Sequence, residues 1–224
     1  MKVYRYIHNW YHKSMNIKIL TIPMIHIGTI EFYNEVSEIL NNMNLVLEEG
    51  IPISIDSEIG SYNKIAKKIG LVSQSEQMKL EKDLKRINID IEHNNFKTQF
   101  EHVSKIELNN VRKFKFLLPF ISKKKLLNMF YYVCAYTTTN KIELINPDNH
   151  YSYKHNKTPL DLLITNTRDE IISKNLQDII NNNKNRDYRY DIGIFFGDEH
   201  MPIIYKTLQN NGFDWELTKK IDIF

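Results

Sequence analysis

Cysteine is nearly absent from this chain of 224 residues, in which Cys134 is the single example. One thiol excludes an internal disulfide and a cysteine-rich zinc site, and it agrees with a reducing compartment. The apolar residues around Cys134 predict that its thiol lies in the core. We therefore expect a cytoplasmic protein that is held together by packing and not by covalent cross-links.

Long hydrophobic runs are lacking as well. The first 13 residues contain no uninterrupted apolar segment, so the sequence predicts no secretory signal peptide. The most apolar later stretch, residues 114–137, is interrupted by Pro119 and by three consecutive lysines. A transmembrane helix needs about 20 consecutive apolar residues. The sequence therefore predicts no membrane-spanning segment and no membrane partner.

No sign of charge dominates, and glycine and proline are scarce. The chain has 30 Lys and Arg residues against 27 Asp and Glu residues, a formal net charge of +3. This excess is too small to imply a polyanionic partner by itself. With 42% hydrophobic and 25% charged residues the composition is that of an ordinary globular protein. The length fits a single domain, or one domain with an insertion.

The hydrophobic period changes twice between residues 19 and 52. The β-branched run Ile19 to Ile25 predicts a buried strand, although Pro23 argues against it because proline donates nothing to a ladder. Residues 31–42 then follow a helical period, and Leu45 to Leu47 predict a second strand. The pattern predicts a strand, helix, strand unit.

Polar side chains follow both strands of this unit. His26 ends the first strand, and Glu48, Glu49 and Gly50 follow the second. Parallel strands joined by one helix end at the same edge of the sheet, so His26 and Glu49 would lie together if the two strands were adjacent. Ligands in open α/β sheets bind at that edge, which makes this pair a candidate site.

A similar pattern closes the chain. Residues 191–196 predict a short buried strand, and Gly197 to His200 follow it directly. Pro202 fits the first turn of a helix that ends near Gly212, and residues 213–221 predict a final strand. Once more a histidine follows a strand.

The N-terminal residues 3–10 alternate loosely and carry several aromatic rings. They fit a strand that pairs with residues 16–22 across a turn. A basic aromatic segment could also stack on nucleic-acid bases. We favour the hairpin and predict no nucleic-acid partner, because the sequence contains no recognisable nucleic-acid-binding motif.

The middle of the chain predicts mainly helices. Ser61 to Ile69 predict a short helix that ends at Gly70, and isoleucines at 87, 89 and 91 indicate a short edge strand. Two further helices are predicted over residues 105–118 and 122–137. We expect a single domain over residues 1–224, in which residues 84–160 form a helical insertion or cap. His150 and His155 fall in a polar loop of this region, and we interpret them as solvated.

Thr167 and Glu170 have the spacing of a capping box at the start of another helix. Arg168 would then lie in the first turn, where the helix dipole disfavours a cation. Two explanations stay open: Arg168 pairs with a carboxylate, which could belong to the site, or it is exposed and tolerated.

His26, Glu49 and His200 therefore share one expected position at the carboxyl ends of strands. Two imidazoles and a carboxylate suit a divalent metal such as Mn, Co or Zn, which lowers the pKa of bound water to about 7. A metal-free alternative has Glu49 or a histidine take a proton from water, while Arg168 stabilises developing negative charge. The expected fold is α/β, with a central mixed, largely parallel sheet flanked by helices.

Four segments carry a resemblance to a known family. They are IPMIHIGTIEFYNEVSEILNNMNLVLEEGI, KIAKKIGLVSQSEQM, TRDEIISKNL and IGIFFGDEHMPIIYKTLQNNGF. In this order they resemble the TraB/PrgY/GumN/TIKI family, which is related more remotely to the erythromycin esterase and ChaN-like proteins. The resemblance covers residues 15–80 and 160–223.

The family pattern has two Gly-x-x-His motifs, a glutamate and a late arginine. The second motif is intact as Gly197 to His200, whereas Pro23 replaces the glycine of the first, which ends at His26. Glu49 best matches the glutamate, with Glu48 as the alternative, and Arg168 matches the arginine. Asp198 and Glu199 replace small residues, and these carboxylates could add ligands, raise nearby pKa values or reflect changed chemistry.

The resemblance implies a metal-dependent, peptidase-like hydrolase, since the animal TIKI members are metal-dependent proteases. Other relatives act on or sequester peptide pheromones. We therefore expect a peptide or a small ester or amide as substrate. The alternative is a non-catalytic protein that binds or sequesters a peptide in the same crevice.

Overall fold

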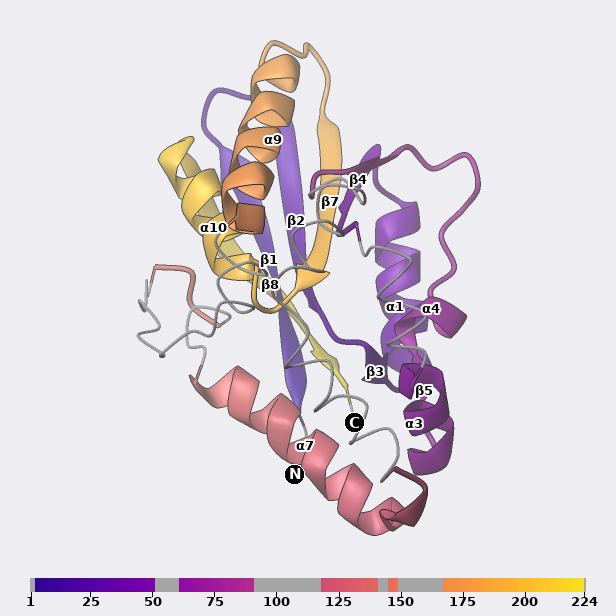
Figure 1. The fold of residues 1–224 in the computed structure, drawn as a ribbon. Coiled ribbons are helices and arrows are strands. Elements are labelled where there is room, and N and C mark those ends of the chain that lie inside the picture. Colours follow the sequence, from indigo (N-terminus) through magenta and orange to yellow (C-terminus); the bar gives the residue numbers. More distant parts are fainter. Residues whose placement is uncertain (1–2, 51–60, 91–117, 141–144, 149–166, 224) are drawn as a thin grey trace.

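The computed structural model describes residues 3–50, 61–90, 118–140, 145–148 and 167–223 (Figure 1). In chain order its elements are β1 (Tyr4–His12), β2 (Ile17–Met24), β3 (Ile27–Gly28), α1 (Ile30–Asn41), β4 (Leu45–Glu48), α3 (Ser61–Ile69), β5 (Val72–Ser73), α4 (Gln74–Gln77), β6 (Arg86–Asn88), η1 (Leu118–Phe120), α7 (Lys123–Asn140), α9 (Arg168–Asn183), β7 (Tyr190–Gly197), α10 (Met201–Asn210) and β8 (Phe213–Asp222).

The main sheet has six strands in the order β6, β4, β7, β2, β1, β8. The pairings β6 with β4, β4 with β7, and β7 with β2 are parallel. Strand β1 runs antiparallel to both of its neighbours, β2 and β8. The prediction of an α/β fold with a mixed, largely parallel sheet is therefore confirmed.

The helices cover the sheet on two sides. Ile192 and Ile194 of β7 pack into one buried cluster together with residues of α9 and α10. The next side chain along the strand, Phe195, faces a second cluster that contains residues of α1 and Cys134 of α7. In Figure 1, α9 and α10 lie on one side of the strands and α1 lies on the other. The alternation explains why β7 is apolar along its length, because both of its faces are buried.

The N-terminal hairpin is confirmed, and two of its aromatic side chains lie in the interior. His8 and Trp10 are both fully buried. Trp10 donates a hydrogen bond from Nε1 to Thr21 Oγ1 of β2 at 3.0 Å, and the rings of His8 and Trp215 pack edge to face. Pro23 is tolerated in β2 because the pairing with β1 extends only from Lys18 to Thr21.

Several helix boundaries agree with the sequence, and others differ. Helix α3 ends before Gly70, which has a φ of +82°, and α7 begins at Lys123 as expected. The predicted edge strand near residue 87 is β6, and the short helix α4 follows β5 directly. Residues 105–117 of the helix predicted over 105–118 lie outside the described residues, and so do His150 and His155.

The predicted capping box at the start of α9 is wrong. Thr167 has helical dihedral angles and its side chain makes no capping hydrogen bond. The first turn of α9 is instead stabilised by contacts of Arg168 and Asp169 with other parts of the chain. Among the described helices, none combines the length and the apolar character that crossing a bilayer requires.

Candidate functional site

Glu49 lies immediately after β4, beside the end of β7. Its Oε2 atom accepts a hydrogen bond from the backbone N–H of Gly197 at 2.9 Å. A Cβ atom on residue 197 would stand 3.2 Å from this oxygen, which is closer than such contacts normally come. The glycine that opens the Gly-x-x-His motif thus lets a carboxylate approach the backbone closely.

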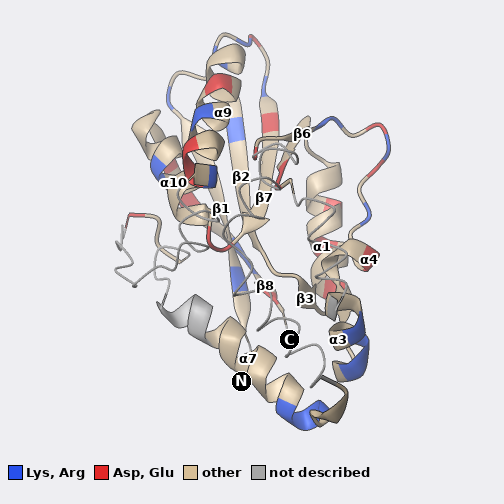
Figure 2. Cartoon of the chain, in the orientation of Figure 1, with Lys and Arg blue, Asp and Glu red and all other residues tan. Residues whose placement is uncertain are grey.

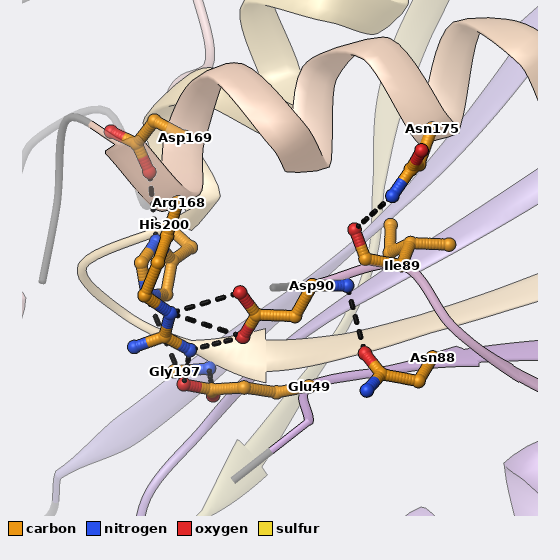
Figure 3. A network of polar contacts seen from close by, with 9 residues as sticks. All are labelled: Glu49, Asn88, Ile89, Asp90, Arg168, Asp169, Asn175, Gly197 and His200. Carbon is orange, nitrogen blue, oxygen red and sulfur yellow. Dashed lines mark hydrogen bonds and ion pairs between the residues drawn. The ribbon is translucent and has the colours of Figure 1, made fainter. Parts of the chain in front are cut away.

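Arg168 joins Glu49 to a second carboxylate, Asp90 (Figure 3). Its Nε donates to Asp90 Oδ1 at 2.9 Å, and its Nη2 donates to Glu49 Oε1 at 2.7 Å and also to Asp90 Oδ2. Arg168 is only 7% exposed. The prediction that Arg168 pairs with a carboxylate is therefore confirmed, and the alternative of an exposed arginine is wrong.

Asp90 is held in place from two directions. Its backbone N–H donates to Asn88 Oδ1 at 2.8 Å, next to the end of β6. From α9, Asn175 Nδ2 donates to the carbonyl of Ile89 at 2.9 Å, so the helix that carries Arg168 is also fixed to the segment that carries Asp90. Figure 3 shows both contacts beside the carboxylates.

His200 stands at the start of α10 and contacts two acidic residues. Its Nδ1 lies 2.8 Å from Asp169 Oδ1, and its Nε2 lies 3.8 Å from Glu49 Oε1. The side chain is 2% exposed. An ionised carboxylate can only accept a hydrogen bond, so Nδ1 carries the proton that Asp169 accepts, and Nε2 is the nitrogen that faces Glu49.

The charges at the site stabilise one another. Burial alone would raise the pKa of Glu49, but the positive charge of Arg168, the neighbouring His200 and the Gly197 N–H together lower it below its usual range. Burial opposes the charged form of Arg168, yet the hydrogen bonds and charges of Asp90 and Glu49 raise its pKa. Both residues are therefore ionised at neutral pH.

The described contacts of His26 are with residues outside this network. Its ring stacks on Tyr62 of α3, with ring centroids 4.7 Å apart. Strand β7 separates β2 from β4, so the two strands are not adjacent. After Met24 the chain also leaves the main sheet, because β3 pairs with β5 and the His26 carbonyl accepts from the N–H of Gln74 at 3.0 Å.

The stacked pair nevertheless lies on the side of the molecule that carries Glu49. In β2, Met24 pairs with Gly197, and His26 follows two residues later. Burial raises the pKa of Tyr62, and the negative charge of Glu49 raises it further. The two aromatic rings are thus close enough to the site to be influenced by its charge.

Two of the remaining carboxylates, Asp198 and Glu48, have cationic partners nearby. Asp198, inside the second Gly-x-x-His motif, receives a hydrogen bond from Arg5 Nη2 at 2.6 Å in a buried ion pair. Glu48 lies 3.5 Å from Arg86. Glu49, and not Glu48, is the residue that the structure brings to Arg168 and His200. Glu199 is exposed.

The three predicted metal ligands form no common cluster among the described residues. Glu49 Oε1 and His200 Nε2 could share an ion at their distance of 3.8 Å, but Arg168 already donates to the same oxygen. His26, the third predicted ligand, stacks on Tyr62. Among the described residues, no group of three or more His, Cys, Asp and Glu side chains is arranged to hold a metal.

Two residues of the site, Asp90 and Asp169, were not assigned a role from the sequence. Asp90 lies inside the edge strand predicted from the isoleucines at 87, 89 and 91, whereas β6 ends at Asn88, so the strand-end argument applies to Asp90 only with the observed boundary. Asp169 was expected in the first turn of its helix, but its partner lies 31 positions later. That contact depends on how α9 packs against α10, which no local pattern reveals.

No protein-family model, no curated protein and no solved structure matches this chain. The resemblance to the TraB/PrgY/GumN/TIKI family therefore stays a prediction, and the function has to be argued from the site itself.

Proposed function

We propose that this protein hydrolyses an ester or amide bond, with His200 as the general base. The observation that carries the proposal is the hydrogen bond between Asp169 Oδ1 and His200 Nδ1, with Nε2 facing Glu49. A carboxylate that holds one nitrogen of a histidine leaves the other nitrogen ready to accept a proton.

In this reaction a water molecule gives one proton to His200 Nε2. Its oxygen forms a bond to the substrate carbonyl carbon, and the imidazolium is stabilised by Asp169 and Glu49 on its two sides. The bond to the leaving oxygen or nitrogen then breaks, and that atom takes the proton back from Nε2. The products are a carboxylic acid and an alcohol or amine.

Arg168 acts in this proposal as a positioning residue. Its donors hold Glu49 and Asp90, and these contacts connect the ends of β4 and β6 with the start of α9. Asp90 keeps the guanidinium in place. We therefore do not assign Arg168 the predicted role of oxyanion donor, because its described donors are directed at Glu49 and Asp90.

The metal-dependent form of the hypothesis stays a prediction. The described network contains three carboxylates: Glu49 and Asp90 contact the guanidinium of Arg168, and Asp169 contacts the ring of His200. This excess of negative charge would favour a cation. The donor set of Glu49 and His200 is nevertheless incomplete for a structural or catalytic zinc site, which uses at least three protein ligands.

Turnover of a panel of nitrophenyl esters and short peptides tests the proposal. We expect the variant His200→Gln to lower kcat about a hundredfold to ten-thousandfold, the usual contribution of a general base. Asp169→Asn should lower it comparably, and Asp178→Asn, at an exposed position of the same helix, should leave it unchanged. Equal activity of His200→Gln and the wild type would refute the proposal.

The same assay separates the alternatives. If activity requires added manganese, cobalt or zinc and His26→Ala removes both the bound metal and the activity, the metal-dependent form is correct. A second candidate function is non-catalytic peptide binding. It is favoured by the hydrogen bond between Arg168 and Glu49, because two charged groups that pair with each other are less available for catalysis. A peptide that binds tightly without turnover in the wild type, and equally in Glu49→Gln, would support that candidate.

A further inference from the structure

Two helix ends at the base of the molecule form a surface that we call the basic corner. It contains the lysines of α3 and of the start of α7, which are Lys64, Lys67, Lys68, Lys123, Lys124 and Lys125. Figure 2 shows that α3 and the start of α7 are both rich in basic residues at the same end of the molecule. The corner lies on elements that the proposed hydrolysis does not use.

The corner is a rigid part of the fold. Ile65, Ala66 and Ile69 of α3 pack with Leu126 of α7 in a buried cluster. Lys68 Nζ donates to the carbonyl of Pro119 at 3.0 Å, which fixes η1 against α3. The lysines are therefore presented at defined positions by packed helices.

The positive charge of the corner is only partly compensated. Lys67 pairs with Glu76 at 2.9 Å. Lys64, Lys123, Lys124 and Lys125 form no ion pair within the described part of the chain, and the first turn of α7 contains no acidic residue. The helix dipole places additional positive charge at that same end of α7. An anionic partner would be attracted to this surface.

Apolar side chains stand beside the lysines. Phe120, between α3 and α7, is 78% exposed, and Tyr132 and Met129 of α7 are 76% and 42% exposed. Lys124, Lys125, Met129 and Tyr132 line a hollow of about 410 Å³ on α7. Lysines that flank exposed aromatic and aliphatic side chains are typical of segments that lie in the interface of an anionic bilayer.

We propose that the basic corner docks this protein on the surface of an anionic lipid bilayer. Phe120 would enter the boundary between headgroups and acyl chains, and the lysines would contact the anionic headgroups. A lipid surface fits better than nucleic acid, because the corner offers lysines and no arginine for bidentate phosphate contacts. The sequence predicted no membrane partner because it contains no spanning segment. This proposal departs from that prediction, since docking on a bilayer surface needs no spanning segment.

Sedimentation of the full chain with phosphatidylcholine vesicles, with and without phosphatidylserine, tests the docking. We expect binding only to the vesicles that contain phosphatidylserine, and weaker binding at higher salt. The triple variant Lys123→Glu, Lys124→Glu, Lys125→Glu should bind at least about a hundredfold more weakly, since each lysine near such a surface contributes about fivefold. Phe120→Ala should also bind more weakly, and its exposed position leaves folding intact.

The matched control is the triple variant Lys174→Glu, Lys184→Glu, Lys206→Glu, which changes the net charge equally at exposed positions of α9, its end and α10. It should bind vesicles much more strongly than the corner variant. Equal losses in the two triple variants, or equal binding to both kinds of vesicle, would overturn the proposal. So would tighter binding of a single-stranded oligonucleotide that only the corner variant loses.

Discussion

Arg168 is the residue on which the site depends most, because it is the cation between Glu49 and Asp90. These carboxylates follow different strands, and both point at a guanidinium that is almost completely buried. Removing one partner of a buried ion pair is costly, because the remaining charges lose their compensation.

We expect Arg168→Met to lower the free energy of unfolding by about 3–5 kcal/mol, measured by urea denaturation at neutral pH. The control is Arg189→Met, whose side chain is 65% exposed and pairs with Asp191. It should cost less than about 1 kcal/mol, the usual value for a surface pair. Similar losses in both variants would show that the buried pairs of Arg168 do not form.

The lowered pKa of Glu49 predicts how the stability of the protein depends on pH in the acid range. Its pKa in the folded protein is below its ordinary value of 4.5. The unfolded state therefore binds the proton more readily, so Glu49 contributes stability that is fully present above about pH 4.5 and is lost as the pH falls through the folded pKa. The free energy of unfolding should decrease over this range.

The variant Glu49→Gln lacks this titration. It should be less stable than the wild type at neutral pH, and the difference should narrow as the pH is lowered below about 4.5. Glu38→Gln, at an exposed position of α1, is the control and should follow the wild type throughout. A constant difference between Glu49→Gln and the wild type at every pH would contradict the lowered pKa.

At the scale of elements, α1 and α9 are each preceded by a threonine, but the first turns of these two helices are stabilised differently. Thr29 precedes α1, and its Oγ1 accepts a hydrogen bond from the N–H of Phe32 at 3.2 Å. Thr167 precedes α9 and makes no such bond. The start of α9 is fixed by tertiary contacts of Arg168 and Asp169.

Thr29→Ala should therefore cost about 1 kcal/mol of stability, the usual value of a lost cap, while Thr167→Ala should cost much less. Thermal or urea unfolding of the two variants side by side measures the difference. A larger effect at Thr167 would mean that the capping box predicted from the sequence forms after all.

At the scale of the whole molecule, the strands and helices were largely predictable because their signals are local. The hydrophobic period distinguishes β2, α1 and β4, and Gly70 and Pro202 mark helix boundaries. Glu49 and His200 could be placed at one edge of the sheet because parallel strands end together. Asp90 was missed because the isoleucines at 87, 89 and 91 predict a longer strand than β6, which ends at Asn88.

The order of the strands was not predictable in the same way. Insertion of β7 between β2 and β4 depends on a segment more than 140 positions away from Leu45, so the two strands are not adjacent, which was the condition for predicting His26 beside Glu49. His26 turns to Tyr62 because two short strands, β3 and β5, draw the chain away from the main sheet. Asp169 meets His200 only through helix packing.

The central claim is that Asp169 holds the proton of His200 on Nδ1 and leaves Nε2 as a base. The most direct test is ¹⁵N NMR of the imidazole nitrogens at neutral pH, with the His200 signals among those of the 8 histidines assigned through His200→Gln. The account predicts a neutral ring protonated on Nδ1, a preference that Asp169→Asn weakens and Asp178→Asn preserves. A ring protonated on Nε2, or one unaffected by Asp169→Asn, would contradict it.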